Sequence, residues 1–254
     1  MHPVSQFLRG MGAPFRGLRI IAANRPLWPL AVAPGILTGL LLVIALYVAL
    51  TSAGSVAVWL LPWVVKWRLL YILARGAMTL LLGLLFGGFA MMLSALVCLP
   101  IHDALSQRVE ALQDTLPPPL SFGEALPTSI LHSVMSFGLW LVLEAVVAPV
   151  QLIPVLGSLL ELVLGFGLTA FFLGHQLVDG PMSRRSMAFG EKMAWLRAHL
   201  PYVLGLGATG TLLIAVPFVN AFCLPIAIAG GTLLFLELHA PSASAPEVGV
   251  PAAD

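Results

Sequence analysis

The chain has 254 residues, of which 59% are hydrophobic and only 9% are charged. In soluble domains roughly a quarter of the residues are charged, because the surface must face water. This composition therefore excludes a soluble globular protein and a soluble enzyme. The formal net charge of +1 excludes a nucleic-acid binder, because it provides no basic field to attract phosphates. The mean hydropathy of +1.01 predicts an all-α integral membrane protein, with residues 1–238 forming one membrane domain.

Residues 1–26 are predicted to form an amphipathic helix at the membrane interface, because arginines alternate there with apolar residues and no acid is present. Two interpretations of Arg19 and Arg25 are open. They bind an oxyanion at the start of the first span, with help from the helix dipole, or they flank the span and contact lipid phosphates.

Two long uncharged stretches follow, and each is long enough to cross a bilayer. Residues 27–50 form an apolar run of 24 residues, which as a helix extends about 36 Å and exceeds the hydrocarbon core of roughly 30 Å. Residues 76–101 form a second run of 26 residues without a charge. Both runs are predicted to be complete transmembrane helices.

Aromatic and glycine residues mark these spans. A spacing of four predicts one aromatic stripe on a helix face, an interfacial anchor at headgroup level, formed by Trp59, Trp63, Trp67 and Tyr71. In the second span, Gly83 and Gly87 form a GxxxG pattern. It indicates either close helix packing, within or between protomers, or a narrow pore lining.

Two further apolar segments, 125–178 and 201–237, are each predicted to form a helical hairpin. Each has an apolar turn with a proline followed three residues later by Gly or Asn, namely Pro154 with Gly157 and Pro217 with Asn220. The second hairpin is expected to break once more, at Pro225.

Backbone groups freed at such turns need protein cover or water at bilayer depth. We therefore expect the two hairpins to penetrate part of the bilayer. Paired, proline-broken segments of this kind either line a transport site or are structural hairpins that bury their tips against neighbours, for example in an oligomer.

Glu144 and Glu161 are the two acids inside the first hairpin segment. An intramembrane carboxylate costs about 2.5–3.5 kcal/mol and normally faces a cavity or a partner. Seventeen residues apart on opposite arms, the two acids would lie at similar depth. They are candidates for proton coupling, or alternatively acids held at the wet end of the hairpin.

Lysine and arginine counts predict the orientation. Segments 1–25, 102–124 and 179–199 face one side and hold nine Lys and Arg, whereas the other side holds three. The positive-inside rule places both termini in the cytoplasm. The tail 239–254 is rich in Ala, Pro and Ser and is predicted to be disordered.

Several segments resemble the CysZ sulfate permease family, which shares a superfamily with the etoposide-induced autophagy membrane protein of eukaryotes. The most specific segment contains Asp179, Pro181, Arg184 and Arg185. The full set of resembling segments is Asp179–Phe189, Ile214–Asn220, Leu224–Thr232, Ile153–Gly157 and Leu99–Glu110. Adjacent residues on a helix point about 100° apart, so Arg184 and Arg185 cannot form one clamp unaided, and they are interpreted as a topology signal in a family-pattern loop.

The resemblance implies two long spans, two hemi-penetrating hairpins, a homo-oligomer in a bacterial inner membrane, and sulfate uptake. One departure stands out: where CysZ-like permeases have an arginine pair before the first span, this chain has Trp28 and Pro29. The leading hypothesis is a permease or channel for a small inorganic anion, sulfate by resemblance. The alternative is a membrane-organising or trafficking protein that transports nothing. The sequence contains no catalytic or metal-ligand pattern, so neither a cofactor nor a metal is expected.

Overall fold

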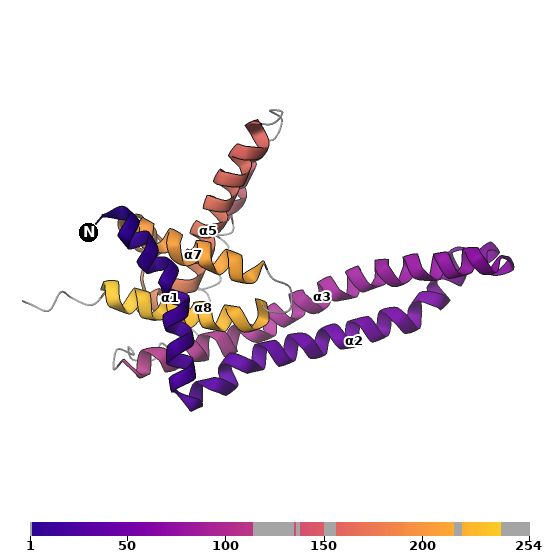
Figure 1. The fold of residues 1–254 in the computed structure, drawn as a ribbon, viewed down its shortest axis with the longest axis horizontal. Coiled ribbons are helices and arrows are strands. Elements are labelled where there is room, and N and C mark those ends of the chain that lie inside the picture. The colour runs from indigo at the N-terminus through magenta and orange to yellow at the C-terminus, as the bar shows by residue number, and fades with distance from the viewer. Residues whose placement is uncertain (1, 114–134, 136–137, 150–155, 216–219, 240–254) are drawn as a thin grey trace, which may run out of the picture. The chain divides into compact units, whose positions relative to one another are not determined.

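The structure, a computed structural model, describes residues 2–113, 135, 138–149, 156–215 and 220–239. Nearly all of these residues are helical, and no strand occurs among them. The elements, shown in Figure 1, are α1 (Pro3–Ala23), the 3-10 helix η1 (Arg25–Leu27), α2 (Trp28–Leu60), the 3-10 helix η2 (Pro62–Lys66), α3 (Arg68–Ala111), a short helix Gly138–Val147, α5 (Leu156–Arg184), α6 (Phe189–Ala198), α7 (Leu200–Ile214) and α8 (Asn220–His239).

Four helices among the described residues are long and apolar enough to cross a membrane: Arg25–Leu60, Arg68–Ala111, Leu162–Arg184 and Phe222–His239. The first two contain the predicted spans and extend past their boundaries. The other two lie in the second arms of the expected hairpins. The chain is therefore an all-α, multi-pass membrane protein, as its composition predicted.

The predicted break at Pro225 is wrong, because α8 continues through this residue. Pro225 is the sixth residue of α8, so its missing N–H removes only the bond to the carbonyl of residue 221. Membrane helices tolerate such a proline where neighbouring groups satisfy the freed carbonyl.

The predicted single aromatic stripe is also wrong. Leu61, the residue before a proline, is disfavoured in a helix, and α2 ends at Leu60. Trp59 therefore lies on α2, Trp63 on η2 and Trp67 just before α3. All three indoles are exposed, by 80%, 57% and 66%, so the aromatic residues surround a turn instead of lining one helix.

The chain divides into two compact units. Unit 1 comprises residues 1–20, 106–211 and 227–254, and unit 2 comprises residues 21–105 and 212–226. The charged side chains described below as the candidate site all belong to unit 1.

Glycines allow the helices of unit 1 to pack closely. A Cβ added at Gly207 would overlap the carbonyl of Ala170 on α5, and one at Gly230 would overlap the carbonyl of Ala13 on α1. In Figure 1, α1 accordingly lies across α7 and α8. Backbones this close leave no room for side chains between them, so small residues specify the packing.

Helix α1 has the two faces expected of an amphipathic helix. Its residues Gly10, Ala13 and Gly17 are buried, whereas its exposed apolar face consists of Val4, Leu8, Phe15 and Leu18. The prediction of a helix over residues 1–26 is confirmed for Pro3–Ala23, and its position at the membrane interface stays a prediction.

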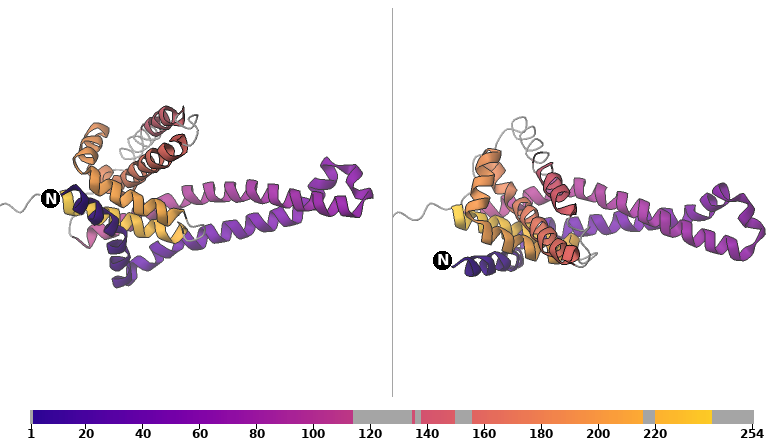
Figure 2. Two further views of the ribbon diagram at one scale, coloured as in Figure 1. Left: turned by 45° about the horizontal axis from the view of Figure 1, so that its top comes forward. Right: turned by 90° about the horizontal axis from the view of Figure 1, so that it is seen from above.

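Unit 2 consists mainly of α2 and α3, which run side by side in both views of Figure 2. The hydroxyl of Thr38 on α2 lies 2.5 Å from the hydroxyl of Ser94 on α3. Beside this contact is a cavity of about 430 Å³ whose lining is largely apolar and includes Cys98, His102 and Phe222.

The two predicted hairpin turns lie outside the described residues, because Pro154 and Pro217 are not among them. Gly157 is buried in the first turn of α5, and Asn220 is the first residue of α8. The part-way penetration of the bilayer therefore stays a prediction. So does the disordered tail, of which only His239 is described, as the last residue of α8.

Candidate functional site

The C-terminal end of α5 has a tight cap that places two arginines next to each other. Ser186 has a φ of 52°, in the left-handed region. Its N–H donates to the carbonyl of Ser183, and the N–H of Met187 donates to that of Met182. This is the Schellman pattern of a helix end, and it stops α5 between Arg184 and Arg185.

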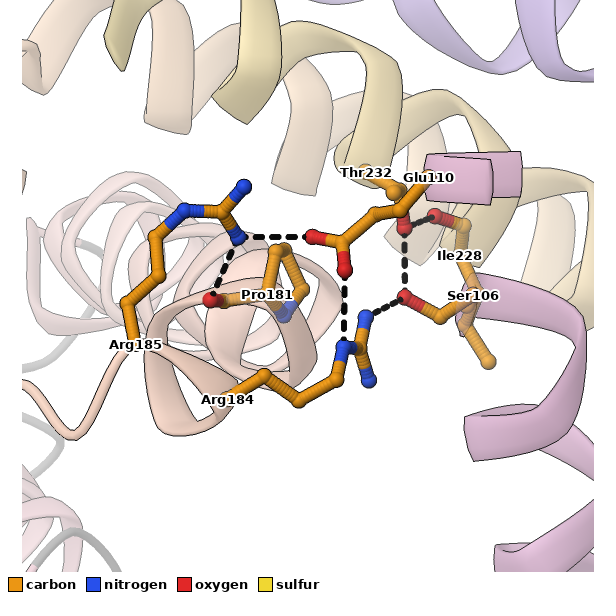
Figure 3. Close-up of polar contacts among 7 residues, drawn as sticks. All are labelled: Ser106, Glu110, Pro181, Arg184, Arg185, Ile228 and Thr232. Carbon is orange, nitrogen blue, oxygen red and sulfur yellow. Dashed lines mark hydrogen bonds and ion pairs between the residues drawn. The ribbon is translucent and has the colours of Figure 1, made fainter. Parts of the chain in front are cut away.

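Both arginines bind one carboxylate, that of Glu110 near the end of α3. The Arg184 Nε donates to Oε2 at 2.9 Å, and the Arg185 Nη1 donates to Oε1 at 2.8 Å, as Figure 3 shows. Glu110 is fully buried, with 0% of its side chain exposed. We call Arg184 and Arg185 the helix-end arginines.

Hydroxyl groups from α3 and α8 extend this network. The Arg184 Nη2 donates to the Ser106 hydroxyl at 2.6 Å. Ser106 also lies 2.8 Å from the hydroxyl of Thr232, which donates to the carbonyl of Ile228. Arg185 donates to the carbonyl of Pro181 and lies over the ring of Phe235. Three helices thus fix the positions of both guanidinium groups.

A second ion cluster lies one turn earlier on α5. The ammonium of Lys192 on α6 has no exposed surface and donates to Asp179 at 2.7 Å and to Ser183 at 2.8 Å. The Ser183 hydroxyl in turn donates to Asp179 at 3.1 Å. His175 is also buried, and its Nε2 lies 3.6 Å from Asp179, which is too long for a hydrogen bond.

Both clusters bring cationic N–H donors together. Among the residues that the structure describes, the helix-end arginines and Lys192 face two carboxylates, those of Glu110 and Asp179. A guanidinium binds carboxylates and other oxyanions through paired N–H groups. The site is therefore suited to hold an oxyanion.

No group of three His, Cys, Asp or Glu residues that could hold a metal ion occurs within the described part of the chain. The donors that converge at the site are cationic N–H groups instead. Its chemistry is recognition of negative charge.

A family model described as sulfate transporter CysZ/etoposide-induced protein 2.4 matches residues 13–225. The chain belongs to this family. The resemblance stated from the sequence is confirmed, and the match includes Asp179, Pro181 and both helix-end arginines.

Three curated relatives, each named Sulfate transporter CysZ, are similar to the chain. Two come from strains of Pseudomonas fluorescens: one is 29% identical over 153 residues (58% of this chain, 60% of the relative), the other 28% over 163 residues (61% and 63%). The third, from Pectobacterium atrosepticum, is 27% identical over 175 residues (67% and 62%). The chain thus spans about three fifths of the length of these CysZ relatives.

The structure brings together the four residues of the family-pattern loop. Asp179, Pro181 and Arg184 lie on α5, and Arg185 follows it directly. We expected that the adjacent arginines cannot form one clamp unaided. The geometry is consistent with this expectation, because the carboxylate of Glu110 lies between the two guanidinium groups and binds both. Their interpretation as a topology signal stays a prediction.

The N-terminal arginines are arranged differently. Arg19 on α1 and Arg25 on η1 are both exposed. Trp28, at the position of the family's arginine pair, donates its indole N–H to the carbonyl of Ile21 at 2.9 Å. This indole therefore satisfies a carbonyl near the end of α1, and anion binding by Arg19 and Arg25 stays a prediction.

The two candidate coupling acids are only partly described. Glu144 is half-buried in the helix Gly138–Val147. Glu161 lies on α5, but its side chain is outside the described part of the structure. Their proposed coupling therefore stays a prediction.

Sequence reasoning missed Glu110, Ser106, Thr232 and Lys192. Glu110 is the last residue of the segment Leu99–Glu110, which resembles the family, but no role was predicted for it. That resemblance was the only signal available for Glu110. Its burial depends on α5 and α8, which are distant in sequence.

Proposed function

We propose that this protein is a permease or channel-like protein for a small inorganic anion, and that the anion is sulfate. The observation that carries the proposal is the convergence of the helix-end arginines on one fully buried carboxylate in a membrane protein. Membership of the CysZ family and relatives named sulfate transporters support the choice of anion. The proposed role is anion translocation, not catalysis.

An anion that enters a membrane protein loses much of its hydration. Removing an ion from water costs several kcal/mol even after relaxation. A pathway for an anion therefore needs fixed cations that offset this desolvation cost. Two guanidinium groups held by Ser106, Pro181 and Phe235 provide this charge in a fixed geometry. Cationic N–H donors held in this way favour an anion over a cation.

Arg19 and Arg25 are proposed to flank the bilayer and attract anions to the protein surface, which their exposure supports. We further propose that both termini are cytoplasmic, as the count of Lys and Arg favours. By analogy with the family, we propose that the protein forms a homo-oligomer in the inner membrane of a bacterium. We propose a proton-coupling role for Glu144 and Glu161 from their sequence positions alone.

Flux of radiolabelled sulfate into liposomes that contain the purified protein tests the proposal. Wild-type protein should exceed empty liposomes, and Arg184→Gln or Arg185→Gln should each reduce the flux about tenfold or more, the effect of losing one charge-assisted hydrogen bond. The matched control is Arg9→Gln, because Arg9 is an arginine ion-paired to Glu237 on the exposed surface.

A folded wild-type protein whose flux equals that of empty liposomes would contradict the permease proposal and favour the membrane-organising alternative. Equal flux from wild type, Arg184→Gln and Arg185→Gln would show that the helix-end arginines are not on the pathway. Gel filtration of each variant before reconstitution checks that it is folded.

A further inference from the structure

Glu110 occupies the position that an oxyanion would take between the helix-end arginines. Each of its two carboxylate oxygens accepts a hydrogen bond from a different arginine. A tetrahedral oxyanion such as sulfate presents pairs of oxygens in much the same way, and guanidinium groups bind both chemical groups. An incoming anion and Glu110 therefore compete for the same donors.

We infer that Glu110 is an internal counter-ion that an entering anion must displace, and that it sets the affinity of the site. This inference rests on the proposed function and adds a specificity-determining residue to it. With Glu110 bound, the arginines have hydrogen-bond acceptors without a solute. Only an anion that binds the arginines more strongly than the Glu110 carboxylate can enter the site. A divalent oxyanion such as sulfate has the charge to do this.

The position of Glu110 on α3 makes displacement feasible. Glu110 is the second-last residue of the helix, which ends at Ala111. The next two N–H groups, of Leu112 and Gln113, complete the last turn by donating to the carbonyls of Arg108 and Glu110. Helix ends open at a lower free-energy cost than helix interiors, so the carboxylate can leave the arginines without unfolding of α3.

The chain provides its own control for this arrangement. On the surface of unit 1, Glu237 also binds two arginines, Arg9 and Arg16. Its side chain is 35% exposed, whereas that of Glu110 is 0% exposed. Water and salt screen the surface cluster, so neutralising Glu237 should create no site for an anion.

Thermal unfolding of the purified full chain, as a function of sulfate concentration at constant ionic strength, tests the inference. A ligand that binds the folded state raises the unfolding midpoint according to its affinity. Glu110→Gln should bind sulfate at least about tenfold more tightly than wild type, because the substitution removes the carboxylate that competes for the arginines. Glu237→Gln should match wild type.

Equal or weaker sulfate binding by folded Glu110→Gln, with wild type binding normally, overturns the inference and leaves the proposed function intact. No binding by wild type and by Glu110→Gln overturns both. If Glu110→Gln does not fold even with sulfate, Glu110→Asp decides. Its shorter carboxylate reaches the two arginines less well, so tighter sulfate binding than wild type supports the inference, and unchanged or weaker binding overturns it.

Discussion

The glycines of α7 and α8 in unit 1 and those of the GxxxG pattern in unit 2 have opposite surroundings. In unit 1, a side chain at Gly207 or Gly230 would meet the backbone of another helix. In unit 2, Gly83 and Gly87 on α3 have nothing within 4 Å of an added Cβ among the described residues. The GxxxG pattern of α3 therefore does not mediate packing against the described part of the same chain, whereas Gly207 and Gly230 in unit 1 do.

The two units also differ in whether the polar groups that they bury are charged. Unit 1 buries a lysine and a glutamate and gives each of them ion-pair partners. In the described part of unit 2, α2 and α3 are joined by a contact between neutral groups, the hydroxyls of Thr38 and Ser94. Close backbone packing excludes water from unit 1, and this raises both the strength of its ion pairs and the cost of breaking them. The following variants test this comparison.

The largest effect is expected for Gly207→Val in unit 1. The new side chain would overlap the carbonyl of Ala170, which is rigid backbone, so we expect a loss of about 3 kcal/mol or more. Gly87→Val, in open space on α3, should leave the unfolding midpoint unchanged. Thermal unfolding and gel filtration measure both, and equal midpoints for the two variants would refute the contrast in packing.

Lys192→Met tests the buried ion pairs. It leaves Asp179 without its main cation, but this carboxylate is 34% exposed, so we expect a loss of about 2 kcal/mol, below the 3–5 kcal/mol of a fully buried pair. Lys66→Met, at an exposed position in unit 2, should change the free energy of unfolding by less than about 0.5 kcal/mol. Denaturation in mild detergent compares them, and a neutral Lys192→Met would show that the buried ammonium is not stabilising.

Thr38→Val measures the strength of a polar contact in unit 2. The substitution keeps the shape and removes the hydroxyl that contacts Ser94. Hydrogen bonds between membrane helices contribute about 0.6 kcal/mol on average, so the loss should be of that size. A loss as large as that of Lys192→Met would mean that polar contacts in unit 2 are as strong as those in unit 1.

Ser186→Gly should produce the smallest effect, and the only stabilising one. Ser186 has a positive φ, which costs a residue with a Cβ about 1–2 kcal/mol. Glycine removes this strain but adds flexibility to the unfolded chain, so a net gain of about 0.5 kcal/mol is expected. A decrease in the unfolding midpoint would show that the Ser186 side chain itself stabilises the end of α5.

Parts of this fold could be predicted from local sequence. Long gaps between charges located α2 and α3, because each gap exceeds the thickness of the hydrocarbon core. The continuity of α8 at Pro225 could not, since it depends on whether one lost hydrogen bond is satisfied by neighbouring groups.

The candidate site was only half predicted. The family pattern selected Asp179, Pro181, Arg184 and Arg185, but helical geometry alone suggested that the two arginines diverge. They converge because α5 ends at Arg184 and Ser186, just after Arg185, lies in the left-handed region, where glycine or asparagine is the usual signal. The partner Glu110 lies 74 residues from Arg184 in sequence, so no local pattern could pair them.

The most direct test of the central claim is calorimetric binding of sulfate to the purified protein. The account predicts that Arg185→Gln reduces sulfate affinity about tenfold or more, as expected for one charge-assisted hydrogen bond. It also predicts that the double variant Arg19→Gln/Arg25→Gln changes the affinity less than about twofold, because exposed charges are screened. The reverse result, with affinity lost from the N-terminal variant and retained by folded Arg185→Gln, would contradict the claim that the helix-end arginines bind the anion.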